Sequence, residues 1–525
     1  MCGAAFRRTP KIAGCVDHNP HSRLSGPKLQ KYRNLQLYEK FQKMFLLIFT
    51  VLILYVVYSW LKIRPANFPP GPPTVPILGA LPFMPKENVH YAMEKWRKQY
   101  GGVVGLVLGT KLSCAAVETK VAKEVLKRDE FQARPISKFI TERSFDRRIG
   151  IMFADGEEWQ EQRRFAVHHL KDFGLGKSSM EGIIMEEVTE LLEEIKDKTL
   201  QVSGLFNIST VNVLWGIIAG TRYKHSDPKL QKLMQLLTAF FRSGNPTGGN
   251  LRMIFPFLKY IFPNYMNEIQ IASEQLNNFF LEIINEHAQS LDENNPRDFI
   301  DVYLIEMNSK KGSNTTFDVQ TLQVVCSDLF SAGSESVGNT LGFALLYMVL
   351  YPEVQEKVHA TIDENIGRNH KLSLQDKVQV PYVEAVILEV MRCNTIAPIT
   401  VPHRAMKDTT LNGYFIPKNT TVLVSLWNVL QDKEHWGDPC NFRPSRFIDE
   451  NGKLVKDNTF IPFGLGKRLC PGEALARNNL FLFFTSIMQK YSVHLPPGHP
   501  TPSTLSLPGF TTAPKPFEVT FKSRK

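Results

Sequence analysis

Cysteine is scarce and scattered in this chain of 525 residues. Its seven cysteines lie at positions 2, 15, 114, 326, 393, 440 and 470. An odd number of widely separated cysteines argues against a disulfide framework, and it favours a reducing compartment. The chain also lacks internal repeats and long low-complexity tracts, which excludes repeat architectures.

An excess of positive charge is missing from most of the chain. The formal net charge is +11, but residues 1–43 hold nine Lys/Arg and two acids, so most of the excess belongs to this leading segment. The charge balance therefore does not favour nucleic acid as a partner. With 43% hydrophobic and 22% charged residues, the composition is that of a globular protein. Since no linker divides the chain after residue 82, we expect one large α-rich domain.

One long uncharged run stands near the start of the chain. Met44–Leu61 holds 18 residues without a charge, roughly 27 Å as a helix and about one hydrocarbon core. Lys62, Arg64 and the proline-rich stretch 69–73 follow, and this stretch cannot form a helix. We therefore expect a transmembrane anchor over 44–61 and a basic, proline-rich hinge over 62–82. A buried core helix is the alternative, whereas no small-residue cleavage site supports a signal peptide.

Residues 1–43 form a basic extension with two interpretations. Arg33, Lys40 and Lys43 lie directly before the expected anchor, so the positive-inside rule gives no clean orientation. Translation from Met44 would remove this conflict. The alternative is a targeting extension, because the segment is poor in acids.

Periodicity predicts several elements of the remaining chain. Gly102–Glu118 reads as two strands joined at Gly109-Thr110, and Thr409–Ser425 as a hairpin that turns at Asn412-Gly413. Residues 155–390 are mostly helical, and Thr316–Tyr351 contains no proline, so it can form one very long helix. Residues 496–515 are rich in proline and glycine and are expected to be irregular.

The segment Phe463–Gly472 (FGLGKRLCPG) holds one cysteine between glycines and an arginine. Glycines without a Cβ let the backbone approach a flat ligand closely. Pro471 is suited to the first turn of a helix, and a helix N-terminus favours the thiolate of a nearby cysteine. This chemistry suits an anionic sulfur bound to a metal, although a buried free cysteine beside a tight turn is the alternative.

The spacing F-x-x-G-x-R-x-C-x-G resembles the haem-ligand signature of the cytochrome P450 family. The chain resembles the animal microsomal group of this family, which contains vertebrate drug and steroid hydroxylases and insect hormone-modifying enzymes. The resemblance implies a mainly α fold with small β-sheets, a single large catalytic domain over 83–525 behind the N-terminal membrane anchor. Since C-x-x-C-H is absent, it implies non-covalent haem b. Cys470 would be the axial iron ligand, and the other expected cofactor-binding residues of the segment are Phe463, Gly466, Arg468 and Gly472.

Two further motifs match the family around this segment. Glu389-Val390-Met391-Arg392 places opposite charges on one helix face, which alone is more often a solvated surface pair. By resemblance, Glu389, Arg392 and Arg446 form a buried structural triad. Trp159 and Arg163 share a helix face, where a half-exposed amphipathic helix is the alternative. By resemblance, Trp159, Arg163, Arg134, His403 and Arg468 surround the haem propionates, although His403 alone reads more often as a structural histidine.

Ala332-Gly333-Ser334-Glu335-Ser336 lies in the middle of the expected long helix. By resemblance, Gly333 lets the helix open beside the iron, and Glu335 and Ser336 deliver protons, so these three are the candidate catalytic residues. Ser336 stands where the family usually has threonine, which keeps the hydroxyl but loses β-branching. A buried Gly/Ser kink without chemistry is the alternative.

The resemblance implies a monooxygenase that inserts one oxygen atom from O2 into a lipophilic molecule such as a steroid, terpenoid, fatty acid or xenobiotic. Electrons would come from NADPH through NADPH-cytochrome P450 reductase, with cytochrome b5 as a second possible donor. Lys467 and Arg477 are candidate reductase contacts, or ordinary solvated charges. The implied location is the endoplasmic reticulum membrane, with the catalytic domain in the cytosol; a mitochondrial location is disfavoured.

Substrate contacts are expected from four segments by resemblance: the residues after Arg134, Leu329–Gly333, Ile396–Val401 and Gly509-Phe510. The aromatic stretch Leu251–Tyr265 is either a second membrane contact or core packing. Two other functions stay open. One is a haem-thiolate isomerase or dehydratase of lipid peroxides that needs neither O2 nor NADPH, and the other is a non-catalytic haem-binding sensor.

Overall fold

The computed structural model describes residues 27–524 except for 86, 175–179, 244–254, 256, 257 and 262–266. The chain divides into two compact units, Met1–Lys62 and Ile63–Lys525. The first unit contains helix α1 (Pro27–Leu61), in which Arg33–Leu61 is long and apolar enough to cross a membrane. The predicted span 44–61 lies within this helix. Most of the described side chains of this helix are exposed, and none within Arg33–Leu61 is buried.

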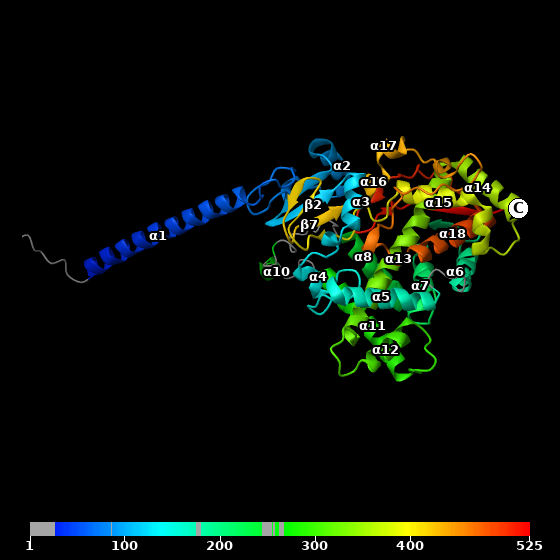
Figure 1. Cartoon of the computed structure of the whole chain (residues 1–525), viewed down its shortest axis with the longest axis horizontal. Helices are drawn as coiled ribbons and strands as arrows, with labels where there is room; N and C mark the ends of the chain where they lie inside the picture. The colour runs from blue at the N-terminus through cyan, green and yellow to red at the C-terminus, as the bar shows by residue number, and fades with distance from the viewer. Residues whose placement is uncertain are drawn as a thin grey trace, which may run out of the picture. The chain divides into compact units, whose positions relative to one another are not determined.

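A small four-stranded sheet forms one side of the second unit. Its order is β1 (Val103–Leu108), β2 (Lys111–Ala116), β7 (Thr421–Val424) and β4 (His403–Arg404), and only the β2–β7 pair is parallel. Helices α2 (Val89–Tyr100) and α3 (Thr119–Lys127) pack against it (Figure 1). The proline-rich segment also lies against β1, where the Gly105 amide donates to the carbonyl of Pro70 (2.7 Å).

Helix α13 (Val319–Leu350) is the centre of the helical part (Figure 1). Asp318 caps its start by accepting from the Thr321 amide (2.7 Å), and at Tyr351-Pro352 the chain bends by 107° into α14 (Pro352–Asn365). Most of its side chains are buried against α7 (Asn207–Ile218), α11 (Asn267–Gln289), α15 (Pro381–Cys393) and α18 (Glu473–Lys490). A helix that is apolar around its whole circumference is expected to be buried in this way.

The other elements complete the unit. The remaining helices are α4 (Lys138–Glu142), α5 (Gly156–Asp172), α6 (Met180–Ile195), α8 (Pro228–Ser243), α10 (Leu258–Ile261), α12 (Phe299–Ser309), α16 (Leu426–Leu430) and α17 (Lys433–Trp436). The remaining strands are β3 (Thr199–Gln201), β5 (Thr409–Leu411), β6 (Tyr414–Ile416), β8 (Tyr491–His494), β9 (Ser506–Leu507), β10 (Ala513–Pro514) and β11 (Glu518–Ser523). Strands β3, β11 and β8 form one sheet, and β5–β6 and β9–β10 form two hairpins.

Most predicted elements are confirmed. The strands at 102–118, the turn at Asn412-Gly413 and the long helix are present. The hairpin predicted over Thr409–Ser425 is partly correct, because β5 pairs with β6, whereas β7 pairs with β2 in the main sheet. The five cysteines among the described residues are all free, as predicted. The aromatic stretch Leu251–Tyr265 lies outside the described residues apart from 255 and α10.

Candidate haem site

Cys470 lies in a tight loop between a short 3-10 turn, Gly466–Arg468, and helix α18. Its amide donates to the carbonyl of Phe463 (3.0 Å). Gly466 has φ +74°, and a Cβ there would lie 2.2 Å from the Leu126 carbonyl oxygen, so only glycine fits this turn against α3. One prediction is corrected: α18 begins at Glu473 with Gly472 as its N-cap, so Pro471 lies before the helix and not in its first turn.

The surroundings of Cys470 do not by themselves produce a thiolate. Burial raises the pKa of its thiol, and Glu473 raises it further, whereas the Gly472 amide and the Arg163 guanidinium lower it. Burial is the largest of these effects because it removes the water that would solvate the anion. A metal ion that binds the sulfur displaces the proton and reverses this balance.

Three arginines and one histidine from distant parts of the sequence meet beside this loop. Arg468 stacks on Trp159 of α5, with its guanidinium carbon 3.5 Å from the ring centroid, and it donates to the carbonyls of Gln132 (2.9 Å) and Ala154 (2.9 Å). Arg134 donates to the carbonyl of Val401 (2.7 Å). The other two are Arg163, which donates to the carbonyl of Leu469, and His403, whose Nδ1 lies 2.8 Å from the carbonyl of Phe131.

The three arginines have few carboxylates near them. Burial and then the positive charge of Arg163 lower the pKa of Arg134 to about 9, and burial and Arg134 lower that of Arg468 to about 8. The same two causes, burial and Arg134, hold the pKa of His403 well below its usual value. Asp155 is the nearby carboxylate, but its Oδ2 already accepts from Arg148 (2.6 Å) and Arg404 (2.9 Å).

The residues present fit a haem group. One guanidinium nitrogen of Arg468, Nη1, is buried without a hydrogen-bond partner, which is costly unless an anion meets it. The two propionates of haem would supply the missing negative charge. Ala332 of α13 is exposed although most of this helix is buried.

The candidate catalytic residues lie on the same stretch of α13. The helix is uninterrupted through Gly333, where a Cβ would come within 2.5 Å of the Leu214 side chain on α7. Because the helix is regular at Gly333, its local opening there stays a prediction. Close packing against α7 is a second reason for glycine at this position. The hydroxyl of Ser336 donates to the carbonyl of Ala332 (2.9 Å), one turn back along the helix.

Glu335 is held by residues that the sequence did not point to. Its carboxylate oxygen Oε2 accepts from Arg242 Nη2 of α8 (2.7 Å) and from the hydroxyl of Thr511 (3.2 Å). Asp328, two turns earlier on α13, accepts from the amides of Ile151 and Met152 (2.9 Å each) and pairs with Arg143. These contacts join segments that are far apart in the sequence, so no local pattern could have revealed them.

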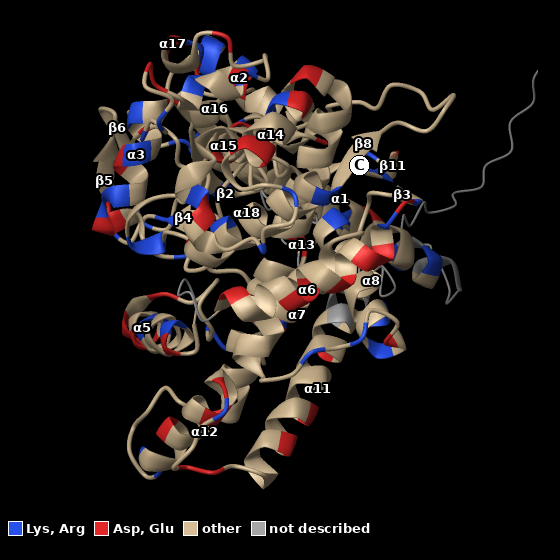
Figure 2. Cartoon of the chain, turned by 90° about the vertical axis from the view of Figure 1, so that its right-hand side faces the viewer, with Lys and Arg blue, Asp and Glu red and all other residues tan. Residues whose placement is uncertain are grey.

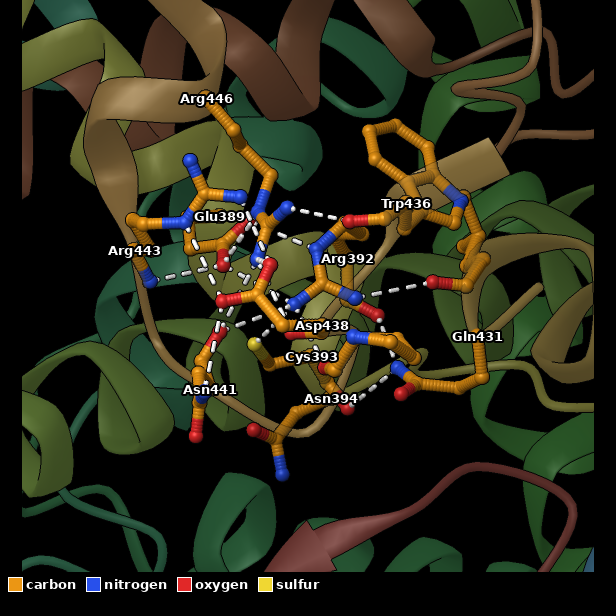
Figure 3. A network of polar contacts seen from close by, with 12 residues as sticks. Glu389, Arg392, Cys393, Asn394, Gln431, Trp436, Asp438, Asn441, Arg443 and Arg446 are labelled. Atoms are coloured by element: carbon orange, nitrogen blue, oxygen red, sulfur yellow. Dashed lines mark hydrogen bonds and ion pairs between the residues drawn. The ribbon is translucent and has the colours of Figure 1, made fainter. Parts of the chain in front are cut away.

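The predicted structural triad is assembled in the structure (Figure 3). Glu389 and Arg392 are fully buried, and their two charge-assisted hydrogen bonds are 2.7 and 2.9 Å long. Arg446 Nε donates to Glu389 Oε1 (2.9 Å), as does the amide of Arg443 (2.9 Å). The alternative of a solvated surface pair is wrong, because both side chains are buried. Buried charges need such hydrogen bonds to offset the loss of water.

Comparison with known proteins agrees with this geometry. A family model described as Cytochrome P450 matches residues 69–521. The chain belongs to the cytochrome P450 family. It is 38% identical over 485 residues to the farnesoate epoxidase of Bombyx mori, covering 90% of this chain and 97% of that protein. It is 39% identical over 496 residues to probable cytochrome P450 305a1 of Drosophila melanogaster (90% and 98% covered) and 36% identical over 454 residues to cytochrome P450 2C23 of Rattus norvegicus (85% and 92%).

The family membership settles the enzyme class. The chain is a cytochrome P450 monooxygenase, with the mainly helical fold and small sheets that the resemblance implied. Haem is the cofactor that the family implies, and the arginine cluster beside Cys470 is consistent with it. The apolar helix α1 is compatible with a membrane anchor.

Proposed function

We propose that this monooxygenase inserts one oxygen atom from O2 into a lipophilic small molecule, using electrons from NADPH that a flavoprotein reductase delivers. The observation that carries the proposal is the cluster of buried and partly buried arginines beside Cys470. Few carboxylates lie near it, so it can receive the propionates of haem. Bound haem would supply the chemistry that activates oxygen, and the Cys470 thiolate would hold its iron.

The other residues bind and position this group. Arg134, Arg163, Arg468 and His403 hold the propionates, and the face of Trp159 supports the Arg468 guanidinium. Phe463, Gly466 and Gly472 shape the loop so that the Cys470 sulfur is presented to the ligand. Glu389, Arg392 and Arg446 fix the chain segment beside this loop.

Residues of α13 supply protons on the opposite side. Glu335 and the hydroxyl of Ser336 are the groups that hold and move a proton there. A local opening of the helix at Gly333 would make room for small molecules beside them. The Ser336 hydroxyl has to leave its bond to the Ala332 carbonyl before it can donate elsewhere.

The substrate is a lipophilic molecule of the steroid, terpenoid, fatty acid or xenobiotic kind, bound by the four apolar segments. Backbone hydrogen bonds join two of these segments to other parts of the chain: the Thr512 amide donates to the carbonyl of Ile396 (2.8 Å), and the Phe510 amide donates to that of Phe241 (3.0 Å). The similarity to a farnesoate epoxidase makes a linear terpenoid the first substrate to test.

We place the protein in the endoplasmic reticulum membrane, anchored by α1 with the catalytic unit in the cytosol, next to NADPH-cytochrome P450 reductase and cytochrome b5. Lys467, whose side chain is 59% exposed, is available to an acidic reductase surface once it leaves Asp129 (2.7 Å). Arg477 is paired with Glu473 (2.9 Å) and covers the Phe463 ring, so it is the less accessible of the two candidates.

The test is turnover of the purified protein, reconstituted with reductase and NADPH, on a panel of terpenoids, steroids and fatty acids under labelled O2. The product should gain one labelled oxygen atom, and its formation should require NADPH and reductase. Rearrangement of a lipid hydroperoxide without either would instead favour the isomerase or dehydratase, and binding without any turnover would favour the sensor. Alkaline extraction of microsomes tests the anchor, because a protein that α1 anchors stays in the membrane fraction.

A further inference from the structure

A cavity of about 220 Å³ is lined by residues of α2, α16, the end of α13, the chain after α15 and the loop that leads to β9. Tyr91 and Cys440 in its lining are exposed, whereas Thr395 is buried, so the cavity reaches inward from the surface. None of its described lining residues belongs to the Cys470 loop, to the arginine cluster beside that loop or to 332–336 of α13. The cavity is therefore separate from the candidate haem site.

Three aromatic rings form an apolar wall of this cavity. The centroids of the His90 and Trp427 rings are 5.4 Å apart, and Tyr91 meets Trp427 edge-on at 5.2 Å. These separations are typical of favourable aromatic contacts, so the rings hold one another in place. His90 is 4% exposed, and burial lowers its pKa to about 4, so its ring is neutral at neutral pH. A further aromatic ring can pack against this wall.

Two side-chain amides in the lining have hydrogen-bonding atoms that the described protein leaves unused. Asn394 Oδ1 accepts from the Tyr347 hydroxyl (2.6 Å), and Gln431 Nε2 donates to the carbonyl of Arg392 (3.0 Å). Among the described residues, nothing pairs with the other atoms of these amides, Asn394 Nδ2 and Gln431 Oε1. Figure 3 shows the Asn394 amide pointing away from the triad. The Thr395 hydroxyl is also buried without a partner. The cavity thus offers an unused donor and an unused acceptor.

The lining determines which class of molecule fits. It includes no Lys, Arg, Asp or Glu among the described residues, so a charged ligand would lose water without gaining a partner of opposite charge. A hydroxyl or amide group both donates and accepts, and it therefore suits the two unused amide atoms. An apolar cavity of roughly 150 Å³ holds one benzene molecule, so about 220 Å³ accommodates a molecule of one or two rings.

We propose that this cavity is a second binding site, separate from the haem site, for a small neutral aromatic molecule that carries a hydroxyl or amide group. The aromatic part lies against the rings of His90, Tyr91 and Trp427. The polar group meets Asn394 Nδ2 and Gln431 Oε1. Binding here involves neither the iron nor the residues that deliver protons, so it does not depend on the proposed function.

Alkylation of Cys440 reports whether the cavity is occupied, because this exposed thiol lines it. The probe is 2-naphthol, a neutral two-ring alcohol, added to the full-length haem protein before iodoacetamide. Mass spectrometry then measures the label at Cys440. At about 1 mM, 2-naphthol should slow this alkylation about threefold, which corresponds to a dissociation constant of about 0.5 mM. Naphthalene, which lacks the hydroxyl, should protect less, and the charged 2-naphthoate should not protect.

Substitutions in the loop before β9 test the location. Thr504→Trp places a large ring at an exposed lining position, and it should remove the protection by 2-naphthol. Thr501→Trp is the matched control, because Thr501 is exposed on the same loop but is not among the described lining residues, so protection should persist. Trp427→Ala removes part of the aromatic wall and should weaken the protection. It also keeps the test available if Thr504→Trp does not fold.

The Soret band of the same samples reports binding of 2-naphthol beside the haem. Protection of Cys440 that Thr504→Trp removes, with or without a Soret shift, supports the second site. A Soret shift without protection would overturn the proposal, because 2-naphthol would then bind only at the haem site, and so would the absence of both effects. Equal protection in the native protein and in Thr504→Trp would contradict the location. Equal protection by 2-naphthol and 2-naphthoate would contradict the class of ligand.

Discussion

At the scale of single residues, the assignment of haem as the cofactor depends on Cys470. Its side chain is partly buried in a loop where burial raises the pKa of the thiol, so we expect bound iron to hold it as a thiolate. Cys470→Ala or Cys470→His should abolish the thiolate-type Soret band of the reduced, carbon-monoxide-treated protein. Difference absorption spectra measure this band.

Cys440 gives the control for that substitution. It is exposed and free, and it lies outside the loop, so Cys440→Ala should keep the band. Retention of the band in Cys470→Ala would contradict the assignment of the axial ligand.

Ser336 is the residue at which this chain departs from the usual threonine. Its hydroxyl bonds to the Ala332 carbonyl and lacks the methyl group that restricts the threonine rotamer. We expect Ser336→Thr to raise the product formed per NADPH and to lower peroxide release, and Ser336→Ala to do the opposite. Peroxide and product yields measured in the same reaction check this. Unchanged peroxide release in Ser336→Thr would show that the role assigned to Ser336 is wrong.

At the scale of elements, the triad joins α15 to the segment around Arg446. Glu389 is fully buried and accepts from Arg392 and Arg446, so removing one arginine leaves part of its charge unpaired. Arg446→Ala should lower the free energy of unfolding by about 3–5 kcal/mol and weaken haem retention. Urea unfolding followed by the haem absorbance measures both effects.

Arg443 offers a neighbouring comparison for this prediction. Its side chain pairs with Asp438 at an exposed position, and only its backbone amide reaches Glu389. Arg443→Ala should therefore change stability little. Equal losses in the two variants would mean that Arg446 acts through something other than the buried charge of Glu389.

At the scale of the whole molecule, charge pairs set how stability depends on pH. Several acidic residues lie along α6 (Figure 2). His225 lies between two of them, with one ring nitrogen 3.3 Å from Glu187 and the other 2.9 Å from Glu194. The hydrogen bond to Glu187, followed by that to Glu194, raises the pKa of His225 to about 9, although burial opposes this. His225 is therefore charged in the folded protein at neutral pH.

The sign of the pH effect follows from this shift. Because the folded pKa is raised, the stabilisation is complete below about pH 6.5 and is lost as pH rises through about 9. The native protein should lose up to about 3 kcal/mol over this window, whereas His225→Gln should lose less. Urea unfolding at several pH values measures the difference. Parallel curves for the two proteins would contradict the assignment.

The sequence by itself determined the features that depend on neighbours along the chain. Four features depend only on short stretches of consecutive residues: the Cys470 segment, the long helix α13 without proline, the strands around Gly109 and the turn at Asn412-Gly413. These predictions succeeded because glycine, proline and apolar periodicity act within a few residues. The prediction that Pro471 lies in the first turn of α18 was wrong, since helix boundaries depend on capping geometry and this helix begins at Glu473.

Only the tertiary structure decided which charges are buried and which of them meet. Glu389 and Arg392 could equally have formed a surface pair, and nothing near Glu335 in the sequence points to Arg242 or Thr511, which lie 93 and 176 residues away. Sequence spacing carries no information about such partners, because packing of α8, α13 and the loop 508–512 brings them together. The cost of burying a charge then makes those contacts necessary, and burial is a property of the folded chain alone.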